Sequence, residues 1–243
     1  MIPARPNRDE LMNTTAGTRP RLALFDLDHT LLPLDSDYEW GEFTLRQGWC
    51  DKQEFGSRNA AFFADYQKGT LDIHEYVRFA TEAIRKLGRE QADAAHALFM
   101  REVIEPNIQA AARALLQQHR DAGDTIVIVT ATNEFVTRPI AKALGVEHLL
   151  AVDLERDASG WITGEIAGVP TMRAGKVTRM NTWLAERGLD WNGVESTFYS
   201  DSMNDVPLLE KVNTPVATNP DARLRQLATE RGWRILDLLE PQA

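Results

Sequence analysis

The sequence predicts an α/β fold, a doubly wound (Rossmann-like) parallel sheet with an inserted all-helical cap domain and a small β-hairpin. From about residue 106 to the end, short buried strand patterns alternate with helical patterns, as in a parallel sheet covered by helices on both faces. Before that point, the segment 35–105 has helical spacing and follows directly on one strand pattern. A helical block in that position predicts a cap inserted into the core after its first strand.

Composition and charge narrow the class of protein. Hydrophobic residues make up 43% of the 243 residues, enough for a buried core, and the formal net charge is −9. An acidic chain argues against nucleic acid as a partner, because phosphate-backbone binding requires a basic face. Cys50 is the only cysteine, which excludes an intrachain disulfide, and no apolar run is long enough to span a bilayer. We therefore expect a cytoplasmic protein without membrane contact, with a loose leader at residues 1–20.

The first predicted strand, Leu22 to Phe25, leads into two aspartates separated by one residue, Asp26 and Asp28. Open α/β sheets place their chemistry at the carboxyl ends of strands. Two carboxylates this close repel each other unless a cation or a proton lies between them. A strand-terminal turn is the alternative explanation, since aspartate is common in turns.

Capping patterns divide the helical segment into four helices. The first three begin with a serine or an aspartate followed three residues later by a glutamate, and these starts are Ser36–Glu39, Asp51–Glu54 and Asp72–Glu75. The fourth helix is expected from about Glu90 to Glu105, where Pro106 ends it.

The remaining elements follow in alternation. The expected helices are 108–120, 133–145, 175–187, 205–212 and 221–231, and the expected strands are 125–129, 148–153, 196–200, 215–218 and 233–236. Asn133 is expected to cap the second of these helices. A turn at Asp157–Gly160 with alternating residues on both sides predicts the hairpin.

Further polar residues stand at the ends of core elements. Thr130 follows a strand and opens a helix start, where hydroxyls and free N–H groups form a phosphate cradle. Lys176 lies in the first turn of a helix, where the positive end of the helix dipole disfavours a cation unless that cation pairs with an anion. Asp201 and Asp205 follow another strand. Each residue alone fits a cap, turn or surface position, but together they predict phosphoryl transfer.

In this order the residues resemble the four motifs of the haloacid dehalogenase superfamily of phosphohydrolases. Asp26-Leu-Asp28-His-Thr30 matches the first motif, Thr130 the second, Lys176 the third, and Asp201 with Asp205 the fourth. The resemblance covers the chain from about residue 21 to the end. The helical insert is similar to the cap of the subfamily that includes phosphoserine phosphatase. We expect a core of residues 21–34 and 106–243 and a cap of residues 35–105.

The resemblance implies a Mg²⁺-dependent phosphomonoester hydrolase with named roles for these residues. Asp26 is the nucleophile that forms an aspartyl phosphate, and Asp28 is the general acid and base. The implied metal ligands are Asp26, Asp201 and the backbone carbonyl of Asp28, with Asp205 holding a metal-bound water or orienting Lys176. The implied phosphate-binding residues are Thr130, Ala131, Lys176 and, as a weaker candidate, Asn204.

The substrate-binding residues depart from the phosphoserine phosphatase pattern. Ala131 and Thr132 stand where those enzymes usually have two glycines, and Asp35 stands where they have a glutamate that meets the substrate amine. Phosphoserine phosphatases carry a cap arginine for the serine carboxylate, and the corresponding position here falls near Ala80. Arg78 and Arg85 could only substitute for that arginine. We expect a small phosphorylated metabolite, of the phosphoserine or histidinol phosphate type, with Asp35 and Arg78 as substrate contacts. Asp35 would alternatively do no more than precede the helix cap Ser36.

Two other functions use the same scaffold. A phosphotransferase or phosphomutase would pass the aspartyl phosphate to an alcohol instead of water, and the sequence does not separate this from hydrolysis. A non-catalytic binding protein would lack at least one motif residue, and none is missing. His29 is expected to be non-catalytic, with its side chain pointing away from the two aspartates.

Overall fold

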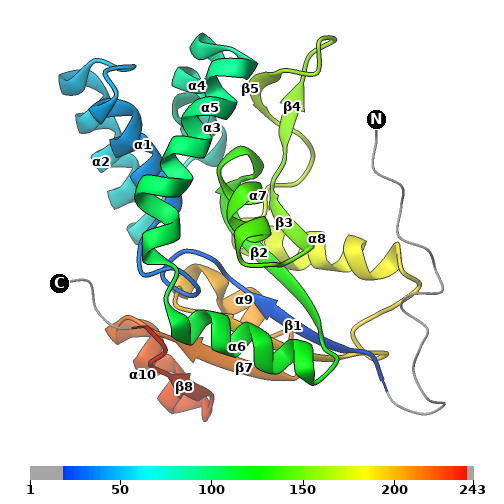
Figure 1. The fold of residues 1–243 in the computed structure, drawn as a ribbon. Helices are drawn as coiled ribbons and strands as arrows, with labels where there is room; N and C mark the ends of the chain where they lie inside the picture. The colour runs from blue at the N-terminus through cyan, green and yellow to red at the C-terminus, as the bar shows by residue number, and fades with distance from the viewer. Residues whose placement is uncertain (1–18, 240–243) are drawn as a thin grey trace.

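The computed structural model describes residues 19–239, so that the predicted leader lies outside the described residues except for its last two positions. Within this range the core is a six-stranded sheet in the order β3-β2-β1-β6-β7-β8, in which all neighbours are parallel (Figure 1). The strands are β1 (Arg21–Phe25), β2 (Thr125–Asn133), β3 (His148–Val152), β6 (Glu195–Ser200), β7 (Thr214–Thr218) and β8 (Arg234–Leu236). The predicted doubly wound sheet is confirmed.

The chain runs outward from β1 to β3 on one side and from β6 to β8 on the other. The strand order therefore reverses between β1 and β6, which pair directly, Phe25 lying opposite Tyr199. In open α/β sheets, ligands bind outside the carboxyl ends of the strands at such a switch point. Asp26 and Asp201 stand at these two ends.

Alternation along the strands gives the sheet two apolar faces. Leu22 and Leu24 of β1 belong to one buried cluster, whereas Ala23 and Phe25 belong to the other. One face packs against α6 (Ala110–Asp121) and α7 (Glu134–Ala143). The opposite face packs against α8 (Ala174–Ala185), α9 (Val206–Leu209) and α10 (Ala222–Arg231). Because both faces are covered, the continuous apolar run of β2 is buried on both sides.

Helical elements fill the chain between β1 and β2, as the sequence predicts for the cap. They are α1 (Ser36–Arg46), α2 (Lys52–Lys68), α3 (Ile73–Ala80), α4 (Glu82–Leu87), α5 (Arg89–Phe99), the π-helical turn η1 (Met100–Ile104) and the 3₁₀ turn η2 (Glu105–Asn107). The expected third helix is interrupted at Thr81, whose hydroxyl donates to the carbonyl of Val77 at 2.7 Å.

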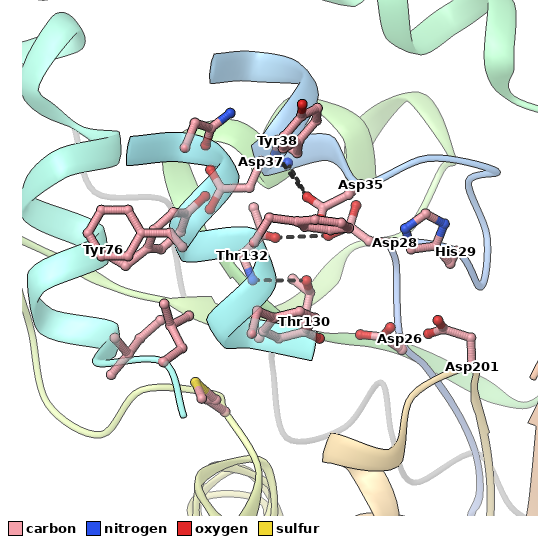
Figure 2. A pocket seen from close by; sticks show the side chains of 18 residues that line it. Asp26, Asp28, His29, Asp35, Asp37, Tyr38, Tyr76, Thr130, Thr132 and Asp201 are labelled. Carbon is pink, nitrogen blue, oxygen red and sulfur yellow. Dashed lines mark hydrogen bonds between the residues drawn. The ribbon is translucent and has the colours of Figure 1, made fainter. Parts of the chain in front are cut away.

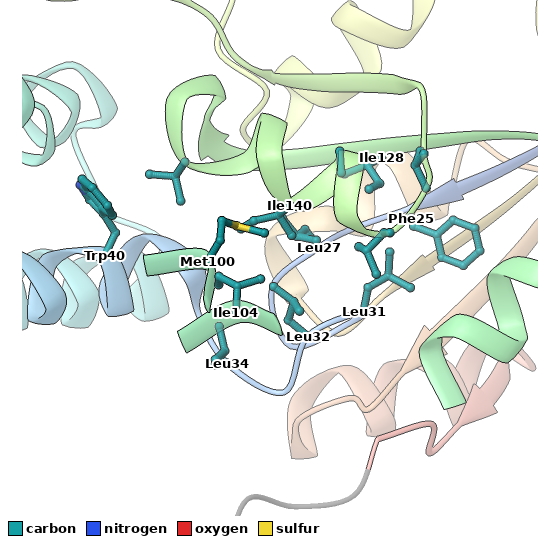
Figure 3. Close-up of a cluster of buried hydrophobic side chains, with 14 of the residues drawn as sticks. Phe25, Leu27, Leu31, Leu32, Leu34, Trp40, Met100, Ile104, Ile128 and Ile140 are labelled. Atoms are coloured by element: carbon teal, nitrogen blue, oxygen red, sulfur yellow. The ribbon is translucent and has the colours of Figure 1, made fainter. Parts of the chain in front are cut away.

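One apolar cluster runs from the sheet into the cap (Figure 3). It begins at Phe25 and passes through Leu27 and Ile104 to Trp40 of α1. Trp40 meets Phe99 of α5 edge to face, with ring centroids 5.2 Å apart. The cap and the α/β domain therefore share part of one hydrophobic core.

The predicted hairpin is present as β4 (Leu154–Arg156) and β5 (Ile162–Ile166). It lies against the cap, because Arg78 of α3 pairs with Glu165 at 3.0 Å and Arg89 of α5 donates to the carbonyl of Gly160 at 2.7 Å. The cap is thus contacted both by the core and by the hairpin. No helix within residues 19–239 combines the length and the apolarity needed to cross a membrane.

Candidate active site

Strand β1 brings Asp26 to the carboxyl edge of the sheet. Its backbone N–H donates to the carbonyl of Tyr199 on β6 at 2.9 Å, which continues the sheet by one bond. The chain then turns sharply, with the carbonyl of Leu27 accepting from the amides of Leu31 and Leu32 and with His29 at a φ of 56°. The turn leaves the carboxylate of Asp26 buried, only 6% exposed, and facing the end of β6.

Lys176 on α8 fixes that carboxylate. Its Nζ donates to Oδ1 of Asp26 at 2.8 Å and to Oδ2 of Asp205 at 2.6 Å, and Ser200 donates to the same Asp205 oxygen at 2.7 Å. Burial by itself lowers the pKa of Lys176, but the two carboxylates outweigh it and the pKa is raised. A lysine that looks misplaced beside a positive helix end is therefore held there by two anions.

Asp28 is held differently, by two uncharged donors. Oδ1 accepts from the backbone N–H of Ser36 at 2.8 Å, and Oδ2 accepts from the hydroxyl of Thr132 at 2.8 Å. Burial, followed by the nearby carboxylate of Asp35, raises the pKa of Asp28 to about 6. A carboxyl group with this pKa exchanges its proton readily near neutral pH.

Asp201 completes an all-oxygen group with Asp26, and Figure 2 shows their carboxylates turned toward each other. The hydroxyl of Thr30 accepts from the backbone N–H of Asp201 at 3.2 Å. Burial, and then Asp26 and Asp205, raise the pKa of Asp201 well above its ordinary value. The carboxylates of Asp26, Asp205 and the partly buried Asp201, together with the ammonium of Lys176, carry a formal charge of −2, which a divalent cation would neutralise.

No three His, Cys, Asp or Glu side chains of the described residues are placed to hold a metal ion among themselves. This arrangement still fits Mg²⁺, which keeps several waters and takes only one or two carboxylates from a protein. Asp26 and Asp201, whose carboxylates face each other, would be those ligands. Asp205 accepts hydrogen bonds from Lys176 and Ser200, and orienting the lysine is one of the two roles expected of it.

The end of β2 carries the residues that are expected to form the phosphate cradle. Thr130, Ala131 and Thr132 line the same pocket as Asp26 and Asp28 (Figure 2). The Thr130 hydroxyl accepts from the amide of Thr132 at 3.1 Å. Strand β2 continues to Asn133, beyond the expected end, and Asn133 caps α7 as expected by accepting from the amide of Val136.

Several predicted residues do not line this pocket. Lys176 lies behind Asp26, and Asn204 donates to the backbone carbonyl of Tyr66 at 3.3 Å, which ties the core to the cap. Arg78 pairs with Glu165 of the hairpin and is about half exposed. The expectation that Arg78 contacts the substrate is therefore wrong, because its guanidinium points toward Glu165 on β5 and Arg78 does not line the pocket.

The start of α1 differs from the expectation. Asp35, not Ser36, is the N-cap residue, and its Oδ1 accepts from the amides of Asp37 and Tyr38 at 3.0 and 2.9 Å. Asp35 also lines the pocket, so its capping role and a substrate contact are compatible. His29 is exposed and lines the pocket as well, contrary to the expectation that it points away.

The cap forms the other half of the pocket and adds residues that the sequence did not single out. One is Asp37, which is only 7% exposed. The others are mainly aromatic and apolar, namely Tyr38, Asn59, Phe62, Phe63, Tyr66, Leu71, Ile73 and Tyr76. Acidic residues are common in the first turn of a helix because they interact favourably with the helix dipole. The sequence alone therefore did not distinguish Asp37 as a pocket residue.

Comparisons with known proteins agree with this geometry. Residues 23–210 match the family model of haloacid dehalogenase-like hydrolases. The chain is 41% identical to a histidinol-phosphatase of Neisseria meningitidis serogroup C, over 89% of this chain and 98% of that protein. It is 35% identical to phosphoserine phosphatase SerB1 of Mycobacterium tuberculosis, over 88% and 70% of the two chains. A solved structure from Bordetella pertussis Tohama I, of unknown function, is similar at a TM-score of 0.86 and 48% identity, covering 91% of this chain and 100% of that one.

Proposed function

The chain belongs to the haloacid dehalogenase-like hydrolase family and is a phosphatase, and from this premise we propose that it hydrolyses a small phosphorylated metabolite through an aspartyl phosphate on Asp26. The observation that carries the proposal is the convergence of Asp26, Asp28, Thr130 and Asp201 at neighbouring strand ends, with Lys176 paired to Asp26. This is the set that phosphoryl transfer requires: a nucleophile, an acid and base, and groups that hold charged oxygens.

In the proposed reaction, Asp26 attacks phosphorus and forms a new P–O bond while the bond to the leaving alkoxide breaks. Asp28 gives its proton to that alkoxide. It then takes a proton from the water that attacks the aspartyl phosphate, which releases inorganic phosphate and restores Asp26. The neutral donors around Asp28 suit this exchange, because neither Ser36 nor Thr132 locks it in the ionised form.

We include Mg²⁺ in the proposal. The residues that would hold it are Asp26 and Asp201 through their carboxylates and Asp28 through its backbone carbonyl. When bound, the ion offsets the repulsion between a carboxylate and an anionic phosphate ester. Lys176, Thr130 and the amide of Ala131 would stabilise the charge on the phosphoryl oxygens.

We propose further that the substrate carries an amine, as phosphorylated amino acids and amino alcohols do. Asp35 supports this, because its carboxylate lies in the pocket on the cap side of Asp28 (Figure 2). The compounds named in the two relatives, histidinol phosphate and phosphoserine, both contain an amine.

The test is an assay of phosphate release over a panel of phosphorylated amino acids, amino alcohols, sugars and nucleotides, with wild type and with Asp26→Asn. The amide is isosteric with the carboxylate but cannot form the acyl phosphate, so turnover should fall to background while the circular dichroism spectrum is kept. Asp26→Asn turnover at a tenth of wild type would contradict the role of Asp26. A second phosphorylated product in place of inorganic phosphate would assign phosphotransfer instead.

A further inference from the structure

The pocket is strongly one-sided in charge. Five carboxylates line it, three at the catalytic end (Asp26, Asp28 and Asp201) and two on the cap side, Asp35 and Asp37. Among the described residues that line it there is no lysine and no arginine. Lys176 and the proposed metal would balance the catalytic end, whereas no cation of the described residues pairs with Asp35 or Asp37.

Asp37 is the more buried of these two cap-side carboxylates and is held from two directions. Asn133, at the core end of β2, donates to its Oδ1 at 3.2 Å, and the hydroxyl of Tyr76 on α3 hydrogen-bonds to it from within the cap. Burial, and next Asp35, raise the pKa of Asp37 to about 8. A role in the helix dipole alone would not require this burial, since Glu39 in the same helical turn is partly exposed.

The surroundings of Asp37 suit a cation with an apolar body. Tyr76 packs against Phe62 at 5.3 Å between ring centroids, and Tyr38 packs against Phe63 at 5.3 Å, and all four rings line the pocket. Aromatic faces attract ammonium groups and flat cationic rings. Figure 2 shows Asp37 and Tyr76 at one side of the pocket and Asp26 and Asp201 at the other.

We propose that Asp37, acting with Asp35, binds the ammonium group of the substrate and that the pocket thereby selects phosphorylated amino alcohols over phosphorylated amino acids. The inference rests on the proposed function and narrows its substrate class. An ammonium supplies the missing counter-charge to Asp35 and lowers the raised pKa of Asp37, so that both are ionised when the substrate is bound. A substrate carboxylate would meet Asp28, Asp35 and Asp37 without a cationic partner, which penalises phosphorylated amino acids.

Three small esters separate these effects. Glycerol 3-phosphate, serinol phosphate and phosphoserine share a three-carbon frame. Serinol phosphate has an ammonium in place of the central hydroxyl of glycerol 3-phosphate, and phosphoserine has in addition a carboxylate in place of the terminal hydroxymethyl group. Wild type should have its highest kcat/KM on serinol phosphate. In Asp37→Asn, kcat/KM on serinol phosphate should fall by about 10- to 100-fold, as expected for a lost charged hydrogen-bond partner, and should hold on glycerol 3-phosphate.

The matched control is Glu39→Gln, which removes a carboxylate from the same turn of α1 outside the pocket and should leave the order of the three substrates unchanged. Equal losses on all three esters in Asp37→Asn, or a wild-type preference for phosphoserine, would overturn the inference. Absence of wild-type activity on every ester, including p-nitrophenyl phosphate, would instead overturn the proposed function. Melting temperatures of each variant report whether it is folded.

Discussion

At the scale of single residues, Asp26 and Asp28 differ in what holds their carboxylates. Asp26 accepts from the ammonium of Lys176, whereas Asp28 accepts from the backbone amide of Ser36 and the hydroxyl of Thr132. Burial raises the pKa of both carboxyl groups, but at Asp26 the ammonium of Lys176 opposes that rise and favours the ionised form, whereas no cation does so at Asp28 among the causes of its shift. The same residue type, two positions apart, is therefore suited to a nucleophile in one place and to an acid and base in the other.

Asp28→Asn tests this division through the leaving group. An alkyl phosphate needs a proton on its departing oxygen, so its turnover should fall by about 10²–10⁴-fold, the range for loss of a general acid or base. p-Nitrophenyl phosphate needs no such proton, so Asp26 should still be phosphorylated and the aspartyl phosphate should accumulate. Rapid acid quenching followed by mass spectrometry measures it. Equal losses of Asp26 phosphorylation with both esters would count against Asp28 as the acid and base.

Asp37 should make the stability of the protein fall as pH rises. Its folded-state pKa of about 8 lies above the unfolded value of 3.8, so its contribution is fully present below about pH 4 and is lost progressively up to about pH 8. The slope is at most about 1.4 kcal/mol per pH unit. In Asp37→Asn the free energy of unfolding, measured by urea titration without Mg²⁺, should decline less between pH 5 and 8 than in wild type. Parallel profiles would contradict the raised pKa.

At the scale of secondary-structure elements, the turn between α2 and α3 contacts the core at the active site. A Cβ at Gly69 would lie 2.9 Å from Nη2 of Arg173, next to Asn204, and the φ of Gly69 is 75°. Nη2 of Arg173 is buried and has no hydrogen-bond partner among the described residues. The cap therefore meets the core here through a close contact that favours glycine, because a Cβ would require the Arg173 guanidinium to shift.

Gly69→Ala should weaken cap closure and raise KM several-fold. The control is Gly48→Ala, because Gly48 has the same φ of 75° but nothing within 4 Å of an added Cβ. Both variants bear the backbone penalty of about 1–2 kcal/mol, so that a difference between them reports the contact with Arg173. Steady-state kinetics with the best amine-bearing ester measures it, and equal KM values in the two variants would show that the turn has no role in closure.

The elements that sequence patterns misplaced are those where a side chain or a proline competes with the helix. Thr81 bonds back to Val77 and divides one predicted helix into α3 and α4. Pro106 lacks the amide that a continued helix needs, and the preceding turns widen into a π-helical stretch at Met100–Ile104. The spacing of apolar residues shows which face of a helix is buried. The local hydrogen bonds at Thr81 and the effect of Pro106 leave this spacing unchanged, so the spacing did not predict the interruptions.

At the scale of the whole molecule, the sequence placed the strand-end residues of the catalytic half in the pocket, but only Asp35 of the cap half. Asp26, Thr130 and Asp201 each follow a strand, and a parallel sheet brings such ends to one edge whatever the loops do. The meeting of Asp37 with Tyr76 and Asn133 depends on how α1 and α3 dock onto the core, which helical spacing does not specify. The same limit explains why Arg78 was placed in the pocket when it faces the hairpin.

The charge of the chain predicts its response to Mg²⁺. The net charge is −9, and within residues 19–239 Asp26, Asp201 and Asp205 lie together with Lys176 as the cation that balances them. An ion that binds the folded state alone stabilises it by about 2.7 kcal/mol at 100 times its Kd. Adding Mg²⁺ should therefore raise the Tm, and EDTA should lower it and abolish activity. In Asp201→Asn the rise should be smaller; an identical rise would place the ion elsewhere.

The central claim is that phosphate passes through the carboxylate of Asp26. The most direct measurement is a single-turnover reaction with Mg²⁺ and excess enzyme, quenched in acid within its first half-life and digested for mass spectrometry. With p-nitrophenyl phosphate as substrate, we predict one phosphoryl group on the peptide that contains Asp26, present in Asp28→Asn at higher occupancy and absent in Asp26→Asn. Phosphate released at full rate with no labelled peptide, or with the label on another residue, would contradict the account.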